Sequence, residues 1–472
     1  MHAADIDLPY GTAYSYLVVG MLTLAYILSF ADRMLLAMMI DPVRASLHLS
    51  DTQISLLLGL AFATFYALLS IPLGRLSDTG RRVDLLAAGV AVWSLATAGC
   101  GLASSAWQLF VARLGVGAGE ATLSPAGYSL IADYFPPGKV GTAMSIYGTG
   151  ITLGAGAAVA LSGAIVGWID PSSILSIPLF GEIAGWQAAF LMLGIPCLGF
   201  AILVRLVIRE PTRRGSAVGS SAPSVTEVVY FIWRHRDAFL PILFGYATLS
   251  IVNYGVSSWA ATFFLRVHSW SPATLGMVYG AILGLGGTFG VVAGGVIADR
   301  LVRGGREHGS ALVVLGSMAL QAPLFLVAFL IRDPSASMVA FGIAVTISGA
   351  AIGLQNVTLQ NMTPNQMRGV MTGLFLMLAN ILGLAIGPTV IAATSDQFFE
   401  GRHALGYALA TTVAICLPLA AGMVIAGLTP ARRMLALQFH AFTDTRQSSL
   451  LVEPVTPDPA SPSHIKEARN AR

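Results

Sequence analysis

Four charged residues lie inside otherwise apolar stretches in the first part of the chain. Asp32 and Arg33 are adjacent in one stretch, and Arg113 and Glu120 lie seven residues apart in another. In a membrane, a charged side chain near the bilayer centre costs about 2.5–3.5 kcal/mol. Two acids and two bases can neutralise one another, and a spacing of seven places Arg113 and Glu120 on one helix face, two turns apart. The pattern predicts a buried cluster of mutually compensating charges.

This cluster has the chemistry of a proton switch. A dry environment favours the neutral form of a carboxylate, whereas a neighbouring arginine favours the charged form. Arginine itself stays protonated, so a movement that alters either effect changes the proton affinity of the acid. We predict Asp32 as the proton acceptor and Glu120 as the second one. Arg33 is expected to pair with Glu120 or to hold an anionic group of a substrate, and Arg113 belongs to the same binding region. The alternative is a static network of ion pairs.

The stretches that position this cluster have the length and composition of membrane-spanning helices. The chain of 472 residues is 55% hydrophobic and 10% charged, whereas a soluble domain carries about 25% charged residues. A spanning helix needs about 20 mostly apolar residues, and long continuous apolar runs favour helices over a β-barrel. About twelve such runs occur, at 14–39, 52–77, 83–103, 106–131, 140–168, 186–208, 239–265, 273–299, 309–331, 335–361, 368–393 and 404–428.

The runs form two sets of six, separated by the longest polar stretch before the tail. We therefore predict an N-terminal six-helix bundle at 1–208, a cytoplasmic linker at 209–236 and a C-terminal six-helix bundle at 237–430. The linker has the Pro, Gly and Ser content of a flexible connection, with a short interfacial helix expected over 225–233. Residues 431–472 are expected to be a disordered cytoplasmic tail, because they are rich in Pro, Ser and charge.

The distribution of Arg and Lys predicts how the chain is oriented in the membrane. If both termini are cytoplasmic, the outer loops carry only Arg44, Arg266, Arg332 and Arg402, and the inner loops carry many more basic residues. Basic residues concentrate in cytoplasmic loops. The sequence therefore predicts a multi-pass protein of the cell (inner) membrane with both termini in the cytoplasm.

A short motif is repeated in the two halves. Gly74 and Asp78 lie at the end of the second apolar run, and Gly295 and Asp299 lie at the end of the eighth, with the same spacing of four and basic residues behind each pair. The two pairs occupy the same place in a six-helix unit, so the chain is expected to consist of two related halves.

The first copy of the motif resembles the loop signature of the major facilitator superfamily. Gly74 would permit close approach of a neighbouring helix, and Asp78 would match the positive N-terminus of a helix facing it. Arg81 or Arg82 could pair with Asp133. Such contacts, together with Asp299 in the second copy, would latch the two halves on the cytoplasmic side as a gate. The alternative is that the basic residues only set the topology.

The second half contains no ionisable residue clearly inside a spanning run. Its polar side chains there are neutral, and Asn253, Tyr254, Asn356 and Asn380 are expected to bind substrate. Ordinary hydrogen bonding between helices is the alternative. A charged first half opposite an apolar second half would suit an amphiphile.

Several other classes of function lack support. Cys100, Cys197 and Cys416 lie in apolar runs and are expected to be small core residues rather than disulfides or metal ligands. No phosphate loop, metal-ligand spacing or nucleophile elbow occurs in the sequence, so we expect no enzyme activity and no cofactor. No basic tract suggests nucleic acid as a partner.

Two segments narrow the family resemblance. Ser29-Phe-Ala-Asp-Arg-Met34 and Arg113-Leu-Gly-Val-Gly-Ala-Gly-Glu-Ala121 resemble the spinster-type branch of the superfamily, whose eukaryotic members are associated with sphingosine-1-phosphate and lysophospholipids. The resemblance implies an all-α fold of twelve helices in two pseudo-symmetric bundles, alternating access, and a monomer surrounded by membrane lipid. It also implies a proton-coupled lysolipid or sphingolipid-like substrate, with Asp32, Arg33 and Glu120 as the coupling and head-group site. Short loops suggest a bacterial member.

Two other functions remain open. A proton-coupled carrier of organic anions or drugs would have the same fold, and related carriers also have an Asp-Arg pair in the first helix. A receptor or scaffold that transports nothing is the third candidate, although it would not need a titratable pair inside the membrane.

Overall fold

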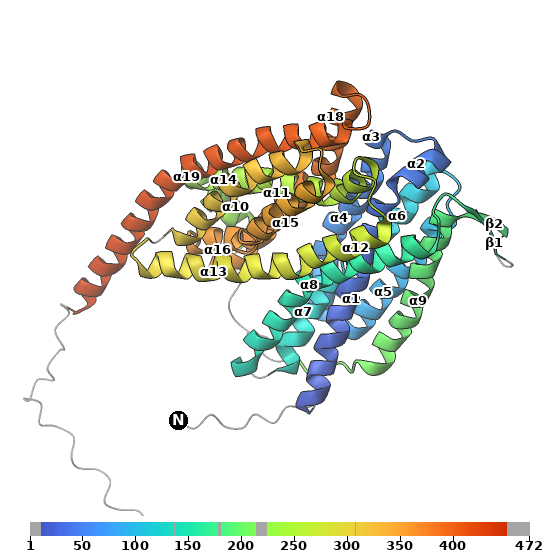
Figure 1. The fold of residues 1–472 in the computed structure, drawn as a ribbon. Coiled ribbons are helices and arrows are strands. Elements are labelled where there is room, and N and C mark those ends of the chain that lie inside the picture. Colours follow the sequence, from blue (N-terminus) through green and yellow to red (C-terminus); the bar gives the residue numbers. More distant parts are fainter. Residues whose placement is uncertain (1–10, 136, 178–180, 214–223, 307, 451–472) are drawn as a thin grey trace, which may run out of the picture.

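The computed structural model describes residues 11–135, 137–177, 181–213, 224–306 and 308–450. Most of them are helical, and Figure 1 shows two bundles inclined to each other. The first half contains α1 (Thr12–Met38), α2 (Ile40–Leu47), α3 (Asp51–Ser55), the π-helix η1 (Leu56–Leu60), α4 (Ala61–Thr79), α5 (Arg82–Cys100), α6 (Ala106–Glu120), α7 (Leu123–Tyr134), α8 (Pro137–Trp168), β1 (Ile174–Ile177), β2 (Gly181–Ala184) and α9 (Gly185–Val207).

The second half follows the linker. It contains α10 (Val225–Arg234), α11 (Arg236–Arg266), α12 (Pro272–Ala281), the π-helix η2 (Ile282–Gly286), α13 (Gly287–Arg303), α14 (Gly309–Leu330), α15 (Pro334–Gly349), α16 (Leu354–Asn361), the 3-10 helix η3 (Asn365–Met367), α17 (Arg368–Asn380), the π-helix η4 (Ile381–Ile386), α18 (Gly387–Phe398) and α19 (Ala404–Leu450).

The apolar runs form the spanning helices that the sequence predicts. Eleven helical stretches of the described chain are long and apolar enough to cross a membrane, and they match every predicted run except 106–131. That run is divided into α6 and α7 by a turn, because the amide and the Oγ1 of Thr122 both donate to the carbonyl of Gly119 (3.2 and 2.9 Å). Neither piece alone is long enough to span a bilayer; together they are the twelfth run.

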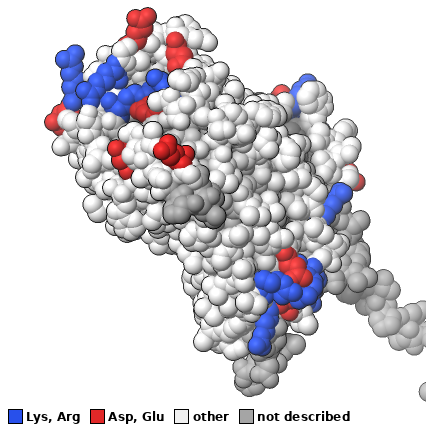
Figure 2. All heavy atoms as spheres, turned by 90° about the vertical axis from the view of Figure 1, so that its right-hand side faces the viewer, with Lys and Arg blue, Asp and Glu red and all other residues white. Residues whose placement is uncertain are grey.

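Charge on the surface follows the same architecture. Figure 2 shows the charged side chains of one face gathered toward two ends of the molecule, with a broad uncharged surface between them. An apolar belt bounded by charge is what a hydrocarbon layer requires. We call the end at which α1 begins the linker end and the end at which α1 finishes the distal end.

Close backbone contacts join the two halves along two seams. In the first seam α8 lies along α12 and η2, as Figure 1 also shows. A Cβ on Gly156 would lie 2.4 Å from the carbonyl oxygen of Gly280. In the second seam η1 and α4 pack against η4, and a Cβ on Gly59 would lie 2.2 Å from the carbonyl oxygen of Leu384. Only glycine allows backbones this close.

Three spanning helices contain a π-helical stretch at these seams. η1 interrupts the second predicted run, η2 the eighth and η4 the eleventh. η1 packs against η4, and η2 packs against α8. The π-helical stretches therefore lie where the halves touch, and π-bulges inside α-helices frequently mark functional positions.

The structure differs from one expectation for the polar segments, confirms another and adds a hairpin. α19 continues to Leu450, so 431–450 is helical rather than disordered; this stretch contains no Gly or Pro and several strong helix formers. Residues 451–472 lie outside the described part. The helix expected in the linker is confirmed as α10, and the unpredicted hairpin pairs β1 with β2 in antiparallel register, Ile174 opposite Ala184.

Candidate functional site

The four charged residues of the first half form two ion pairs between α1 and α6. Asp32 pairs with Arg113, and its other oxygen accepts a hydrogen bond from Thr97 Oγ1 on α5 (2.7 Å). Asp32 and Arg113 are both 1% exposed. Both carboxylate oxygens of Asp32 are thus occupied by donors, as a buried charge requires.

The second pair is arranged differently. Arg33 donates to Oε2 of Glu120 through Nε (3.0 Å) and Nη2, and Ser29 Oγ donates to the same oxygen (2.6 Å). The other oxygen, Oε1, is buried and has no hydrogen-bond partner among the described residues. Leaving a buried polar atom without a partner costs free energy, and among the described residues Oε1 of Glu120 is the unsatisfied acceptor of the cluster and Nε of Arg113 its unsatisfied donor.

Arg33 is the accessible member of the cluster. Its side chain is 20% exposed, whereas that of Glu120 is 1% exposed. The guanidinium carbon lies 4.1 Å from the ring centroid of Phe62, 5.2 Å from that of Phe30 and 5.7 Å from that of Tyr66. Aromatic faces stabilise a cation at these distances. The first half therefore exposes the guanidinium of Arg33 beside three aromatic rings, and its counter-charge, Glu120, is buried next to it.

Of the four residues predicted in the second half, Tyr254 is linked to the surroundings of this cation, and Asn380 is linked to Tyr254. Tyr254 on α11 packs against the apolar cluster that contains Phe62, whose ring lies against Arg33, and Tyr254 donates to Asn380 Oδ1 on α17 (3.3 Å). Asn253 is half-buried, one residue before Tyr254.

Asn356 takes part in a different set of contacts. Its Oδ1 accepts a hydrogen bond from Thr372 Oγ1 (3.0 Å), which itself accepts from Gln360 (3.2 Å). These residues lie on α16 and α17, the parts of their spanning stretches nearer the linker end. The chain of hydrogen bonds stays within the second half and does not bring Asn356 to Arg33.

At the linker end, Arg82 forms the centre of a second buried network. It pairs with Asp133, donates through Nε to Glu210 (2.7 Å), and donates to the carbonyl of Pro211 (2.9 Å). The other oxygen of Glu210 accepts from the amide of Val83 (2.9 Å). All of these partners belong to the first half or the start of the linker. We expected the Arg82–Asp133 pair to latch the two halves together, and this expectation is corrected. The network around Arg82 joins the start of the linker to the first half.

The remaining predicted gate residues have few contacts between the halves. A Cβ on Gly74 would meet no described atom within 4 Å, so the close approach expected there is absent. Arg81 is exposed, and its Nη1 lies 3.4 Å from Oδ2 of Asp84. Asp299 is exposed on α13. The side chain of Asp78 lies outside the described part of the structure.

A cluster that the sequence analysis missed joins the halves at the distal end. Arg266 on α11 pairs with Asp41 (2.6 Å) and with Asp51 (2.6 and 3.1 Å) of the first half, and Arg44 also pairs with Asp51 (2.9 Å). We call Asp41, Asp51 and Arg266 the distal latch. Every ion pair between the halves, among the described side chains, lies here. The sequence held one signal for such a cluster: Asp41 and Asp51 lie close to Arg44, one of the few basic residues of the outer loops.

The family follows from comparison with known proteins. Residues 22–388 match the family model described as Major Facilitator Superfamily. This chain belongs to that superfamily. The predicted fold of twelve helices in two bundles is confirmed, and the chain is a multi-pass membrane transporter that is similar to spinster proteins.

Relatives within the superfamily agree with the resemblance seen in the sequence. The chain is 26% identical over 416 residues to an MFS-type efflux pump of Mycolicibacterium smegmatis, covering 86% of this chain and 90% of the pump. It is 27% identical over 409 residues to human protein spinster homolog 1, covering 81% and 73%. A bacterial homolog of the human lysosomal transporter spinster, crystallised in an inward-facing and unoccupied conformation, is 26% identical with a TM-score of 0.76, covering 90% of this chain and 99% of that one.

Proposed function

We propose that this transporter moves an amphiphilic solute with an anionic head group by alternating access, coupled to protons. The observation that carries this proposal is the Arg33–Glu120 pair. It combines an accessible cation with a buried carboxylate, one oxygen of which has no hydrogen-bond partner in the described part of the chain. The chain is similar to spinster homologs, and the resemblance of its sequence to that branch implies a lysolipid or sphingolipid-like solute.

Proton binding and substrate binding are linked at this pair. A proton added to Oε1 of Glu120 removes the charge that holds the guanidinium of Arg33. Arg33 can then pair with an anionic head group, which a bidentate guanidinium suits. When the solute leaves, Arg33 returns to Glu120 and the proton is released. Each ligand therefore favours the other, as thermodynamic linkage requires.

We assign Asp32 a second, supporting role in the coupling. Both of its oxygens have donors, so a proton there must first displace Arg113 or Thr97. The geometry favours Glu120 as the first proton acceptor, with Asp32 responding when Arg113 moves. On the opposite side, Tyr254, Asn253 and Asn380 would face the solute, and the apolar residues around them would contact its tail.

The arrangement of the halves supports an inward-facing state. Ion pairs close the distal end, and the similar bacterial structure was solved facing inward. We propose that the bundles at 1–208 and 237–430 move as units about the central cluster, that Asp78, Arg81, Gly74 and Asp299 come together when the linker end closes, and that this end is cytoplasmic.

A carrier of drugs or organic anions is the second candidate. The similarity to the efflux pump of Mycolicibacterium smegmatis favours this candidate, because the match covers 90% of the length of that pump. The two candidates share the fold and the proton site and differ only in the solute.

Thermal stability of the purified protein with a panel of lysolipids, sphingoid phosphates and small organic acids, at two pH values, distinguishes the candidates. A ligand at about 100 times its dissociation constant stabilises by roughly 2.7 kcal/mol. A lysolipid-specific shift that is lost in Arg33→Ala supports the first candidate, and a shift with small acids alone supports the second. Arg236→Ala is the matched control, since Arg236 also lies over a ring, that of Trp233, but at the linker-end surface.

Proton coupling is tested in proteoliposomes with the solute so identified. Glu120→Gln imitates the protonated acid, so we expect solute binding to persist and its pH dependence to disappear, together with proton-driven accumulation. Glu227→Gln, at an exposed position on α10, is the control. Accumulation that keeps its pH dependence in Glu120→Gln would refute the coupling role.

A further inference from the structure

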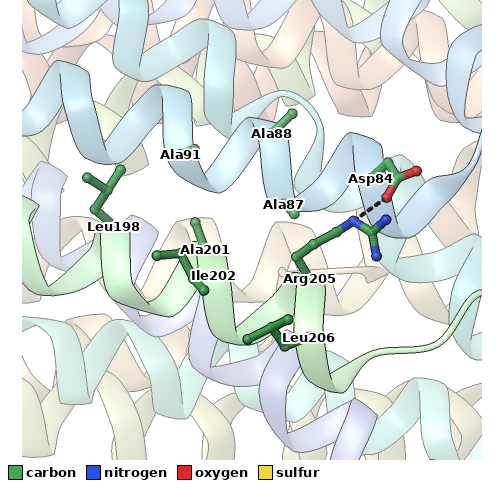
Figure 3. A pocket seen from close by; sticks show the side chains of 9 residues that line it. All are labelled: Asp84, Ala87, Ala88, Ala91, Leu198, Ala201, Ile202, Arg205 and Leu206. Carbon is green, nitrogen blue, oxygen red and sulfur yellow. Dashed lines mark ion pairs between the residues drawn. The ribbon is translucent and has the colours of Figure 1, made fainter.

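A groove lies between α5 and α9 on the outside of the first half, apart from the charged cluster. Its volume is about 490 Å³, within the range of small-molecule sites. Figure 3 shows the nine residues that line it; they come from these two helices alone. None of them belongs to the pairs around Asp32 and Glu120.

The greater part of the groove is apolar and shallow-walled. Three alanines of α5, Ala87, Ala88 and Ala91, leave space between the helices, and Leu198 and Ile202 of α9 form the opposite wall. Ala88 and Ile202 are exposed, so the groove opens sideways, toward the lipid that surrounds a spanning helix. The separation of seven positions between Asp84 and Ala91 corresponds to about 10 Å of helix, roughly a third of the hydrocarbon core.

One end of the groove is charged. Asp84 lies in the first turn of α5 and Arg205 in the last turn of α9, and their Oδ1 and Nε atoms are 2.6 Å apart. Arg81 lies 3.4 Å from the same carboxylate. The two arginine side chains are 50% and 59% exposed. Since a guanidinium has five N–H donors, two arginines sharing one carboxylate leave a net positive charge and free donors at the mouth.

We propose that this groove binds an anionic glycerophospholipid of the leaflet at the linker end. One acyl chain lies along the alanines of α5, and the phosphate accepts hydrogen bonds from Arg205 and Arg81. The depth of the site matches this orientation, because helix ends lie at head-group level and the alanines lie in the hydrocarbon layer. The charge at the mouth selects an anionic head group over a zwitterionic one.

Such a lipid would act on stability rather than on the transported solute. It would join the start of α5 to the end of α9, the two elements that also hold Arg82 and the start of the linker. The site is therefore independent of the solute proposed above.

The test uses the full-length protein in a neutral detergent. Phosphatidylglycerol and phosphatidylcholine with identical acyl chains are added in turn, and binding is followed by native mass spectrometry and by the unfolding temperature. We expect phosphatidylglycerol to bind and stabilise, and Arg205→Ala to weaken it about tenfold through loss of a charged hydrogen bond. Ala88→Phe, at an exposed position, is expected to abolish binding by filling the groove. Arg303→Ala, an exposed arginine in the last turn of α13, is the matched control.

Other outcomes would overturn the proposal. Equal binding of the two lipids would remove the role of the head group, and phosphatidylglycerol binding that survives both Arg205→Ala and Ala88→Phe would place the lipid elsewhere. A shift with glycerol phosphate alone would indicate a site for the anion rather than the lipid. A dimer that disappears in Ala88→Phe would identify a second copy of the chain as the occupant.

Discussion

The distal latch makes a quantitative prediction about the balance between conformations. Arg266→Gln removes the cation that holds Asp41 and Asp51 of the first half against α11 of the second. The loss of one partner from a buried, hydrogen-bonded charge pair costs 2–5 kcal/mol. The side chain of Arg266 is 21% exposed, which places the cost at the lower end, at about 2 kcal/mol. Every 1.4 kcal/mol is a factor of ten, so states with separated distal ends should gain about 30-fold.

The assay is a distance measurement between spin labels at Ser104 and Glu400, exposed positions in distal loops of the first and second half. The three native cysteines are free thiols and must first be replaced. In Arg266→Gln we expect a longer distance to become populated. Arg44→Gln is the control, because Arg44 pairs with Asp51 within the first half. An unchanged distance in Arg266→Gln, or the same change in Arg44→Gln, would show that the latch does not hold the halves together.

Three further predictions concern other contacts. Gly156→Ala places a Cβ against the Gly280 carbonyl and should lower stability by about 1–3 kcal/mol through overpacking, whereas Gly148→Ala, with no described atom within 4 Å, should not; chemical denaturation compares them. Arg82→Gln removes the ion pairs with Asp133 and Glu210 and should cost about 3 kcal/mol, which Arg82→Lys should partly restore in the same measurement. Burial lowers the pKa of His268 below its usual value, so its contribution to stability should be complete above about pH 6.5 and be lost as the pH decreases below that value. Unfolding temperatures measured across this pH range test the prediction. If the unfolding temperature of His268→Gln decreases with pH as steeply as that of the parent protein, the prediction is wrong.

The spanning helices could be predicted from the sequence because a bilayer leaves few solutions for long apolar runs. The division of the fourth run was not predictable from hydropathy, since it depends on side-chain and backbone bonds of Thr122 to Gly119. The helix beyond residue 430 was missed for another reason. Composition counts Pro and Ser over the whole tail, whereas helix propensity depends on the local stretch.

The candidate site was predictable in its members and less so in its pairing. Two acids and two bases inside apolar runs indicate compensation, and the sequence left Glu120 as one of two partners for Arg33. Which oxygen stays without a partner depends on packing, because only the fold brings Ser29 and Thr97 to the two acids. In the proposed mechanism, that detail changes the preferred proton acceptor from Asp32 to Glu120.

Residues far apart in the sequence were the hardest to connect. Asp41, Asp51 and Arg266 each look like ordinary loop charges, and nothing local indicates that they meet across the two halves. The same holds for Glu210, which the chain brings back to Arg82 after more than a hundred residues.

The π-helical stretches have a consequence for comparing this chain with others. A turn with i to i+5 bonding holds about one residue more than the α-helical turn it replaces, and one residue corresponds to a rotation of about 100°. In the second spanning helix, η1 lies between Asp51 of the distal latch and Tyr66 beside Arg33. In a relative whose second spanning helix is α-helical throughout, one residue fewer would be needed to keep the counterparts of Asp51 and Tyr66 on the same helix faces as here. An alignment without a single-residue gap at 56–60 would then compare residues from different faces, and any transfer of site residues along that helix would be shifted by one.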